Sequence, residues 1–283
     1  MSISNKCIVC DGVFIEPLYQ GILQCQGCGH VFADLRLTDK ELFELYDEQY
    51  FRGEEYWDYA SDKRIIQKNF RLRYDVLRSF LEPDRHQSLF EIGSAYGFFL
   101  DVVRNDFQSV QGIDITESGT RYAREQLNLN VAQGDLLQYD LGNQKFDVVC
   151  MWDTIEHLHS PHLYIEKASE HLESGALLAV TTGDIESLNA RIRKDKWRLI
   201  HPPTHVHYFS AKTLARMLNN YGFEVIYNRY CGFYRSVENI AYNILVLRQG
   251  KRRLFDLLQK TGIANFDLYL NLYDIMYVIA RKR

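Results

Sequence analysis

Four cysteines near the start of the chain have the spacing of a metal site. Cys7 and Cys10 are separated by two residues, as are Cys25 and Cys28. Each pair fits a tight knuckle, and two knuckles supply four thiolates, the ligand set of a closed tetrahedral zinc site. We therefore predict a structural Zn²⁺ and a zinc ribbon over residues 1–35, whose folding energy the metal would supply. Iron is an alternative metal for this ligand set.

The role of this ribbon stays open at the level of sequence. It could bind nucleic acid, bind a substrate, or cap one end of a larger domain. The few basic residues in the segment disfavour nucleic acid. His30 is an alternative fourth ligand, although Cys28 completes the symmetric pattern. Cys150 and Cys231 lie in apolar surroundings and are interpreted as core residues.

A glycine-rich loop is the second pattern with chemical meaning. Residues 91–97 follow an apolar run that predicts a strand and precede a run that predicts a helix. Gly93 allows a sharp turn, and Gly97 allows a ligand to approach the backbone closely. Asp114 ends the next predicted strand, where a carboxylate can hold ribose hydroxyls. These features predict a nucleotide site and fit a dinucleotide enzyme equally well.

Three further features narrow the kind of nucleotide. Asp135 follows the third predicted strand, where its carboxylate can accept a hydrogen bond from an adenine amine. Residues 146–149 open the fourth predicted strand, and the segment 152–158 follows that strand immediately.

The elements that must position these residues alternate along the chain. From about residue 85, short apolar runs alternate with longer amphipathic ones, which predicts βαβ units and an α/β fold with a mainly parallel sheet. The predicted strands are residues 88–92, 109–113, 128–132, 146–151, 176–181, 223–228 and 274–280. The predicted helices include residues 118–126 and 161–172. We predict three segments, namely the ribbon (1–35), a helical cap (36–84) and a nucleotide-binding domain (85–283).

Composition and charge limit the functional classes. A hydrophobic content of 46% permits a sizeable core without disulfides, and a net charge of −4 argues against a surface built as a whole for nucleic acid. The first residues contain no apolar signal region, and no run approaches the roughly 20 apolar residues that span a bilayer. We therefore expect a cytoplasmic chain without a membrane span, in which thiols stay reduced.

Together, the glycine-rich loop, the two carboxylates and the segment 152–158 resemble the class I S-adenosylmethionine-dependent methyltransferases. Within that class the resemblance is to the ubiquinone-biosynthesis O-methyltransferase-like branch, in a version with an N-terminal zinc ribbon. It covers roughly residues 40–283. It implies a Rossmann-like, doubly wound sheet of seven strands whose last strand is antiparallel.

The resemblance also implies roles for residues of the cofactor site. Glu91, Gly93 and Gly97 would hold the methionine end of S-adenosylmethionine. Asp114 would take the ribose, and Asp135 would take the adenine. The other predicted cofactor contacts are Ala95, Ile115, Leu136, Trp152 and Asp153. Of these, the tryptophan and the aspartate would close the pocket, and the alanine stands where the family usually has a third glycine.

Methyl transfer from a sulfonium mainly requires proximity, alignment and exclusion of water. A hydroxyl acceptor also benefits from a general base, and histidine is suited to that role near neutral pH. The segment 197–210 follows the fifth predicted strand and resembles a loop that recurs in the same branch. We predict His205 as the base and His207 as a second candidate. The alternative is that these histidines only bond to the backbone and shape the loop.

Asp153, Glu156 and His157 form another group of candidate catalytic residues. At positions i, i+3 and i+4 they would share one helical face, and their spacing resembles a divalent-metal pattern of quinone O-methyltransferases. We favour the interpretation of a helix start and pocket wall over a metal ligand set. Asp153 and His157 are included among the catalytic candidates.

Two segments are candidates for contacts with the methyl acceptor. The basic stretch 191–198 is either a solvated helix face or a contact for a phosphate or carboxylate. The aromatic residues from Tyr50 to Tyr59 would, by the resemblance, cover the site and stack on a sugar or ring.

The favoured function is methylation of a small-molecule, sugar or glycan acceptor, most simply at a hydroxyl. One alternative is an RNA methyltransferase whose ribbon docks nucleic acid, but the acidic charge and the lack of an Asn-Pro-Pro-Tyr-like motif count against it. The other alternative is a noncatalytic scaffold, which the intact cofactor motifs disfavour. The sequence does not predict the oligomeric state.

Overall fold

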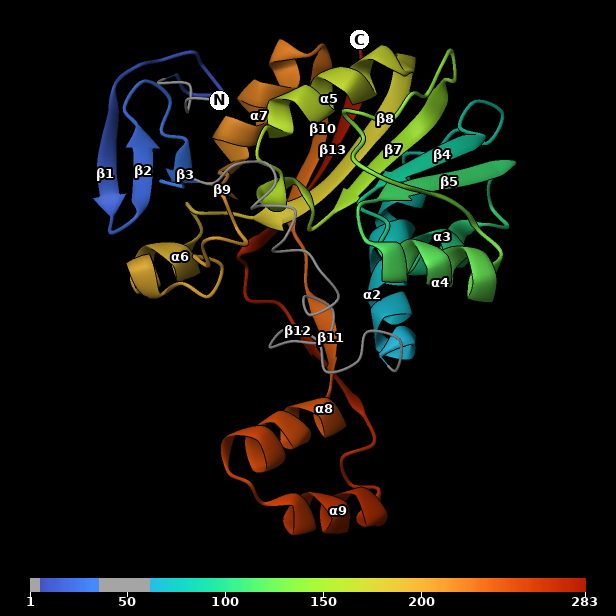
Figure 1. Ribbon diagram of the computed structural model, residues 1–283, viewed down its shortest axis with the longest axis vertical. Coiled ribbons are helices and arrows are strands. Elements are labelled where there is room, and N and C mark those ends of the chain that lie inside the picture. Colours follow the sequence, from blue (N-terminus) through green and yellow to red (C-terminus); the bar gives the residue numbers. More distant parts are fainter. Residues whose placement is uncertain (1–5, 36–61) are drawn as a thin grey trace.

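The computed structural model describes residues 6–35 and 62–283, and the predicted aromatic cover between Tyr50 and Tyr59 lies outside these residues. A seven-stranded sheet forms the centre, with the spatial order β10-β13-β8-β7-β4-β5-β6 (Figure 1). In chain order its strands are β4 (Ser88–Ile92), β5 (Ser109–Asp114), β6 (Asn130–Gln133), β7 (Phe146–Trp152), β8 (Leu172–Gly183), β10 (Phe223–Tyr230) and β13 (Ile275–Lys282).

The pairing of these strands confirms the predicted fold class. Strands β6, β5, β4, β7 and β8 pair in parallel, whereas β13 runs antiparallel to both β8 and β10. The central strands are buried almost throughout, as expected for parallel strands covered on both faces.

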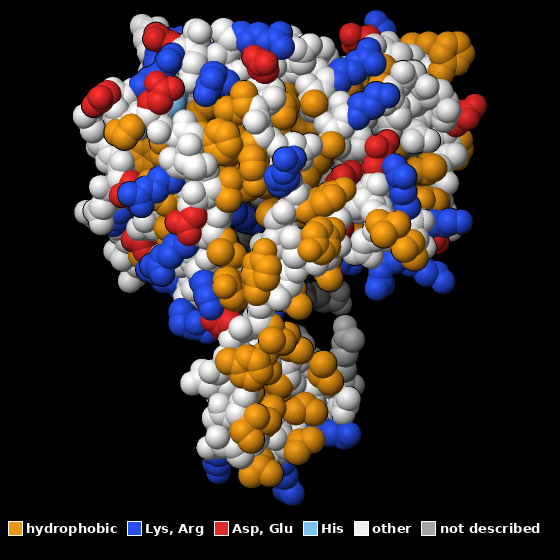
Figure 2. Space-filling view, turned by 180° about the vertical axis from the view of Figure 1, so that it is seen from behind, with side chains coloured by type: hydrophobic (Ala, Val, Ile, Leu, Met, Phe, Trp, Pro, Cys, Tyr) orange, Lys and Arg blue, Asp and Glu red, His pale blue; other side chains and the backbone are white. Residues whose placement is uncertain are grey.

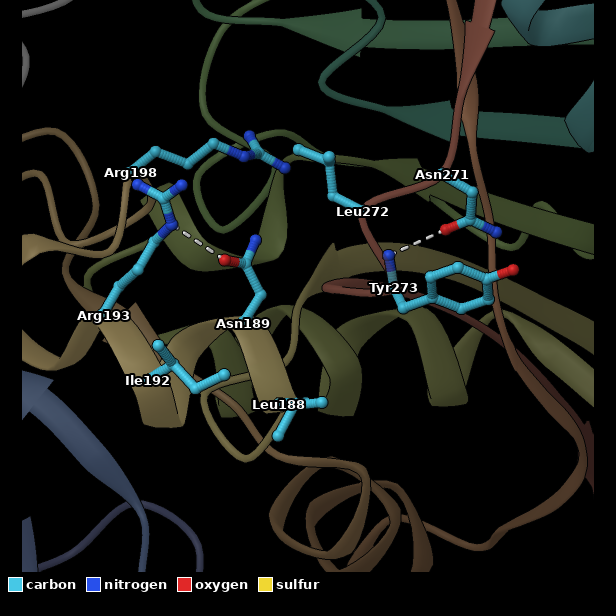
Figure 3. Close-up of a pocket in the computed structure, with 8 residues that line it drawn as sticks. All are labelled: Leu188, Asn189, Ile192, Arg193, Arg198, Asn271, Leu272 and Tyr273. Atoms are coloured by element: carbon cyan, nitrogen blue, oxygen red, sulfur yellow. Dashed lines mark hydrogen bonds between the residues drawn. The ribbon is translucent and has the colours of Figure 1, made fainter.

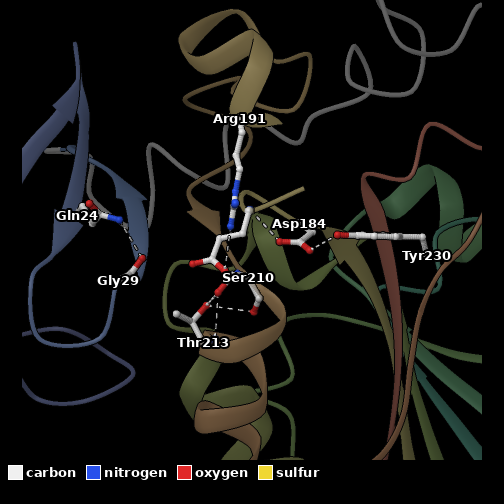
Figure 4. Close-up of polar contacts among 8 residues, drawn as sticks. Gln24, Gly29, Asp184, Arg191, Ser210, Thr213 and Tyr230 are labelled. Carbon is white, nitrogen blue, oxygen red and sulfur yellow. Dashed lines mark hydrogen bonds and ion pairs between the residues drawn. The ribbon is translucent and has the colours of Figure 1, made fainter. Parts of the chain in front are cut away.

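Helices cover both faces of the sheet. On one face lie α5 (Pro161–Glu170) and α7 (Ala211–Asn220), and on the other lie α2 (Lys63–Arg78), α3 (Phe98–Val103) and α4 (Glu117–Leu127). A capping box between Ser210 and Thr213 begins α7 (Figure 4). Directly after β8, Asp184 accepts a hydrogen bond of 2.8 Å from the hydroxyl of Tyr230 in β10 (Figure 4).

Several predicted boundaries differ from the observed ones for local reasons. Strand β6 begins at Asn130 rather than at residue 128, because Asn128 ends α4 in the left-handed conformation, with a φ of 51°. Helix α5 ends at Glu170 because the chain already enters β8 at Leu172, four residues before the predicted start of that strand.

The N-terminal ribbon shares a sheet with the larger domain. Strands β1 (Ile15–Tyr19), β2 (Ile22–Cys25) and β3 (Val31–Ala33) form an antiparallel sheet, to which β9 (His207–Tyr208) adds a fourth strand. Strand β9 lies in the segment 197–210, which contains the predicted general base His205. The short helices η2 (Ile155–His157), α6 (Leu188–Arg193) and η3 (Lys194–Lys196) lie in the loops after β7 and β8.

An arm projects from the sheet before the last strand. Its stem is the hairpin of β11 (Phe233–Ser236) and β12 (Asp267–Leu270), and it carries α8 (Val237–Tyr242), η4 (Asn243–Arg248) and α9 (Arg252–Thr261) (Figure 1). Apolar side chains lie exposed on the arm and on the neighbouring loop, as Figure 2 shows. Over residues 6–35 and 62–283, no helix has the length and apolar character needed to cross a bilayer.

Candidate functional site

The glycine-rich loop between β4 and α3 makes a tight cradle. Gly93, Ala95 and Gly97 all have a positive φ, of 78°, 45° and 73°. A Cβ at Gly93 would lie 2.5 Å from the side chain of Thr154, and one at Gly97 would lie 2.7 Å from Leu129. The third positive φ explains why a glycine suits the position of Ala95, since this conformation is strained for a residue with a Cβ.

Asp114 at the end of β5 fixes this cradle. Its Oδ2 accepts a hydrogen bond of 2.7 Å from the amide of Ala95, and its Oδ1 accepts bonds from the amide and hydroxyl of Thr116. The carboxylate is buried, and burial raises its pKa despite these hydrogen bonds. Asp114 therefore fixes the conformation of the loop through these hydrogen bonds. Its contact with a ribose stays a prediction.

Glu91 is a buried carboxylate whose hydrogen-bonding capacity is incompletely used. Its side chain is 2% exposed at the end of β4, and its Oε2 has no hydrogen-bond partner among the described residues. Burial raises its pKa well above the usual value, and the charge of Asp114 adds to this effect. An orphaned buried oxygen beside this glycine-containing loop fits a ligand that brings a hydrogen-bond donor, such as the ammonium group of S-adenosylmethionine.

The third predicted cofactor carboxylate lies on the next loop. Oδ1 of Asp135 accepts bonds of 2.9 Å from the amide of Leu137 and 2.5 Å from the hydroxyl of Tyr164. Leu136 is buried and Ile115 is half-buried. These contacts orient the Asp135 side chain after β6, while the predicted adenine contact is not tested by them.

At the end of β7, Trp152 packs edge-on against Phe99 and Tyr277 and is largely buried. The adjacent Asp153 has a φ of 50° and an ion pair of 2.5 Å with Arg73 of α2. It also accepts a bond of 2.8 Å from the hydroxyl of Thr181.

The ion pair decides the charge of Asp153. Burial by itself would raise the pKa of this carboxyl, but the guanidinium of Arg73 and the hydrogen bonds hold it below the usual value. Sequence reasoning missed Arg73, because its position in a helix with many charged residues gives no signal of a partner 80 residues away.

Three side chains from the loops after β7 and β8 lie close together. Glu156, His157 and His205 each offer a ligand atom, and these atoms lie within 4.8 Å of one another. The two imidazole rings meet edge to face with centroids 4.6 Å apart. We call this group the Glu156 cluster.

The protonation of the Glu156 cluster follows from its contacts. Nδ1 of His157 lies 2.9 Å from the carbonyl oxygen of Thr204, and Nδ1 of His205 lies 2.9 Å from that of Leu199. A carbonyl only accepts, so each Nδ1 carries a hydrogen, and in a neutral ring the lone pair then lies on Nε2. Burial lowers the pKa of His157 to about 3, and burial followed by repulsion from Asp153 raises the pKa of Glu156 to about 8.

His207 lies apart from this group, in the contact between the ribbon and the loop. Its Nδ1 lies 3.1 Å from Nε2 of the fully buried His30, and its Nε2 donates to the carbonyl oxygen of His159. Both ring nitrogens of His207 therefore bind other parts of the protein.

The four ribbon cysteines come together as their spacing predicts. The Sγ atoms of Cys7, Cys10, Cys25 and Cys28 all lie within 4.8 Å of one another. Two of the separations, Cys7 to Cys28 and Cys10 to Cys25, are 3.6 Å. This donor set fits a tetrahedral thiolate-bound metal such as Zn²⁺.

The basic stretch borders a hollow of about 580 Å³ between α6 and the residues before β13 (Figure 3). Arg193 and Arg198 line it together with Tyr273. Arg198 forms an ion pair of 3.0 Å with the buried Asp274, which also accepts bonds from Asn189 and Trp197. This part of the stretch therefore supports the fold as well as lining the hollow.

Comparison with known proteins identifies the family of the chain. The family model described as a methyltransferase domain matches residues 65–228, more than half of the chain. No curated protein sequence matches the chain.

Several solved structures have a similar fold. Magnesium protoporphyrin IX methyltransferase from Synechocystis, solved with bound S-adenosylhomocysteine, is 12% identical, with a TM-score of 0.55 over 87% of this chain and 100% of that one. A methyltransferase dependent on S-adenosylmethionine from Thermotoga maritima is 18% identical, with a TM-score of 0.53 over 86% and 98% of the two chains. A third, from Clostridium acetobutylicum, is 8% identical, with a TM-score of 0.52 over 79% and 96%.

At these sequence identities the solved structures show only that the fold is similar. The assignment to a family rests on the family model that matches residues 65–228. The chain belongs to the methyltransferase domain family, and it is a class I S-adenosylmethionine-dependent methyltransferase.

Proposed function

We propose that this methyltransferase methylates a hydroxyl of a small-molecule, sugar or glycan acceptor, as in the ubiquinone-biosynthesis O-methyltransferase-like branch. The observation that carries the proposal is the Glu156 cluster, which sets two imidazoles and a buried carboxyl on the loops after β7 and β8. Such loops, at the carboxyl ends of the strands, are where α/β sheets meet their ligands.

His205 is the proposed general base. The bond from its Nδ1 to Leu199 fixes the ring and leaves the lone pair on Nε2, the atom that would take the hydroxyl proton. The ring of His157 packs edge to face against the ring of His205 and helps to hold it in place. Asp153 is better suited to hold Arg73, and His207 to hold His30, so both are weaker candidates for proton transfer.

S-adenosylmethionine, when bound, supplies the activated methyl group. The orphaned Oε2 of Glu91 supports a contact with its ammonium, and the tight turn of Gly93 and Gly97, both with a positive φ, supports a backbone contact with its methionine end. We further propose ribose contacts from Asp114 and Ile115. Adenine contacts from Asp135 and Leu136, and a pocket closed by Trp152 and Asp153, complete the proposed cofactor site.

The remaining proposals concern the accessory parts of the chain. We propose Zn²⁺ in the four-cysteine site and a cytoplasmic location, where the thiolates stay reduced. The division at residues 35/36 and 84/85 remains a proposal. Since α2 is matched by the family model and packs against α3, the segment before residue 85 contributes to the methyltransferase core.

The first test is cofactor binding. We expect calorimetry to detect S-adenosylmethionine binding to the full chain and to detect weaker binding after Glu91→Gln, which keeps the shape but removes the charge. His171→Ala, at the end of α5, serves as a control. Unchanged affinity in the Glu91 variant would refute the proposed ammonium contact.

The second test concerns the acceptor. Release of S-adenosylhomocysteine is measured with a panel of sugars, phenols and bulk RNA. We expect turnover with hydroxyl-bearing small molecules and a strong loss of kcat after His205→Ala. Binding to RNA that weakens steeply with salt, together with RNA-dependent turnover, would favour the nucleic-acid alternative.

A further inference from the structure

We infer that the Glu156 cluster binds one divalent transition-metal cation, at a site separate from the four cysteines. One carboxylate and two imidazoles supply the ligand atoms, which already lie within 4.8 Å of one another. A set of two histidines and one carboxylate is a known way to hold a catalytic divalent metal with open coordination positions.

The hydrogen bonds of the two histidines match those of metal ligands. In protein metal sites, a ligating imidazole usually donates its other N–H to a carbonyl or carboxylate, which fixes the tautomer and the ring. His157 and His205 both do this, with Nδ1 2.9 Å from the carbonyl oxygens of Thr204 and Leu199. The hydrogen on Nδ1 that ligation through Nε2 requires is therefore already in place.

Glu156 provides the independent observation. Its side chain is 5% exposed, and its Oε2 has no hydrogen-bond partner among the described residues. A buried carboxylate oxygen without a partner is unfavourable, typically by about 1–3 kcal/mol. A cation at the centre of the cluster would give this oxygen a partner and favour the ionised form of the carboxyl.

Backbone contacts hold the three ligands in place. The amide of Val206 donates a bond of 2.9 Å to the carbonyl oxygen of Glu156, which ties the loop after β8 to η2. The amide of His205 donates to the carbonyl oxygen of His201 in a local turn. The two loops that carry the ligands are therefore joined by a backbone hydrogen bond.

This ligand set differs from the Asp153, Glu156 and His157 pattern seen in the sequence. Asp153 is held by Arg73 and Thr181, and His205 takes the third place although it lies 48 residues after His157 in the chain. With two imidazoles, the site favours cations such as Zn²⁺, Fe²⁺ or Mn²⁺ over Mg²⁺, which prefers oxygen ligands.

Cation binding does not depend on the proposed methyl transfer. If both occur, His205 becomes a ligand, and the cation rather than its Nε2 would polarise the acceptor hydroxyl. Without a cation, His205 remains the proposed base.

Mn²⁺ is the probe of choice, because four thiolates prefer softer ions and the unpaired electrons of Mn²⁺ report binding directly. We expect paramagnetic resonance on the full chain to detect one bound Mn²⁺. The affinity for Mn²⁺ should fall about tenfold or more after His205→Ala or Glu156→Gln, since mutating even the residues that hydrogen-bond to metal ligands has an effect of this size. His159→Ala, on the same loop but exposed, should leave it unchanged.

S-adenosylmethionine binding in the same samples shows whether each variant is folded. The proposal is overturned if the wild type binds S-adenosylmethionine but neither Mn²⁺ nor Zn²⁺ beyond the four-cysteine site. It is also overturned if folded Glu156→Gln and His205→Ala chains bind Mn²⁺ as the wild type does. In both cases the proposed methyl transfer would stand, since cofactor binding and turnover test it separately.

Discussion

At the scale of single residues, Ala95 stands where the family usually has a glycine, and this alanine strains the backbone. Its φ of 45° places a Cβ in the left-handed region, at a strain of roughly 1–2 kcal/mol for an L-residue. The amide of Ala95 nevertheless donates to Asp114, so the loop keeps its shape. The chain tolerates the strain because neighbouring contacts fix the backbone.

Replacing Ala95 with glycine should therefore stabilise the protein. The released strain exceeds the roughly 0.4–1 kcal/mol by which glycine favours the unfolded chain, and we expect a net gain of about 0.5–1 kcal/mol. Urea unfolding measures the difference. Ala123→Gly, in the buried face of α4, is the matched control and should destabilise instead. A destabilised Ala95→Gly chain would contradict this account.

At the scale of elements, β9 joins the ribbon sheet to the loop that contains His205. Val31 and Phe32 of β3 pair with Tyr208 and His207, and the rings of His30 and His207 stack with centroids 5.3 Å apart. Nδ1 of His30 is buried without a partner among the described residues. The ribbon therefore supports the loop of His205 instead of standing as a separate module.

We expect His30→Ala to loosen this contact by about 2–3 kcal/mol, because it leaves a cavity and removes the hydrogen bond to His207. Amide hydrogen exchange should become faster in β9, while S-adenosylmethionine affinity stays the same. The exposed Gln26→Ala is the control within the ribbon. Unchanged exchange in β9 would show that the strand pairing alone holds the contact.

The arm is fastened to α2 by a charged contact. Asp267 of β12, whose side chain is 6% exposed, accepts bonds from both terminal nitrogens of Arg64 and from Lys68. These hydrogen bonds, led by that of Arg64, hold the pKa of Asp267 well below its usual range. The stabilisation is complete above the unfolded pKa of about 3.9 and is lost as the pH falls toward the depressed folded value.

Asp267→Asn should lower the free energy of unfolding at pH 7 by about 1–2 kcal/mol, since the charged hydrogen bonds are lost. The difference from the wild type should shrink when unfolding is measured near pH 3. Asp256→Asn removes an exposed pair with Arg252 in α9 and should change little at either pH. A difference that grows on acidification would have the wrong sign for this mechanism.

At the scale of the whole molecule, sequence reasoning succeeds where the signal is local. Alternating apolar runs predict the strands of the central sheet, and knuckle spacing predicts that Cys7 and Cys28 meet. The contacts that it misses join distant segments, such as Arg73 with Asp153 and β3 with the two-residue strand β9. A strand of two residues has no periodicity, and an arginine in a helix carries no mark of its partner.

The same long-range contacts predict that a metal bound by the ribbon cysteines would affect activity. Cys7 and Cys25 belong to the core cluster that also contains residues of α5 and α7, and β9 continues the ribbon sheet into the loop of His205. Loss of the metal should therefore disorder the acceptor side of the site. The cradle follows β4, which belongs to the seven-stranded sheet and not to the ribbon sheet, so we expect it to be less affected.

We thus expect Cys25→Ser, or removal of Zn²⁺ by a chelator, to abolish acceptor turnover while reducing S-adenosylmethionine affinity by less than about threefold, a change of under 1 kcal/mol. Calorimetry with the cofactor and acceptor assays on the same preparation separate the two effects. Restoring Zn²⁺ to the chelated wild type should recover turnover, whereas Cys25→Ser should not respond. Parallel loss of cofactor binding would mean that the ribbon stabilises the whole domain rather than the acceptor loop alone.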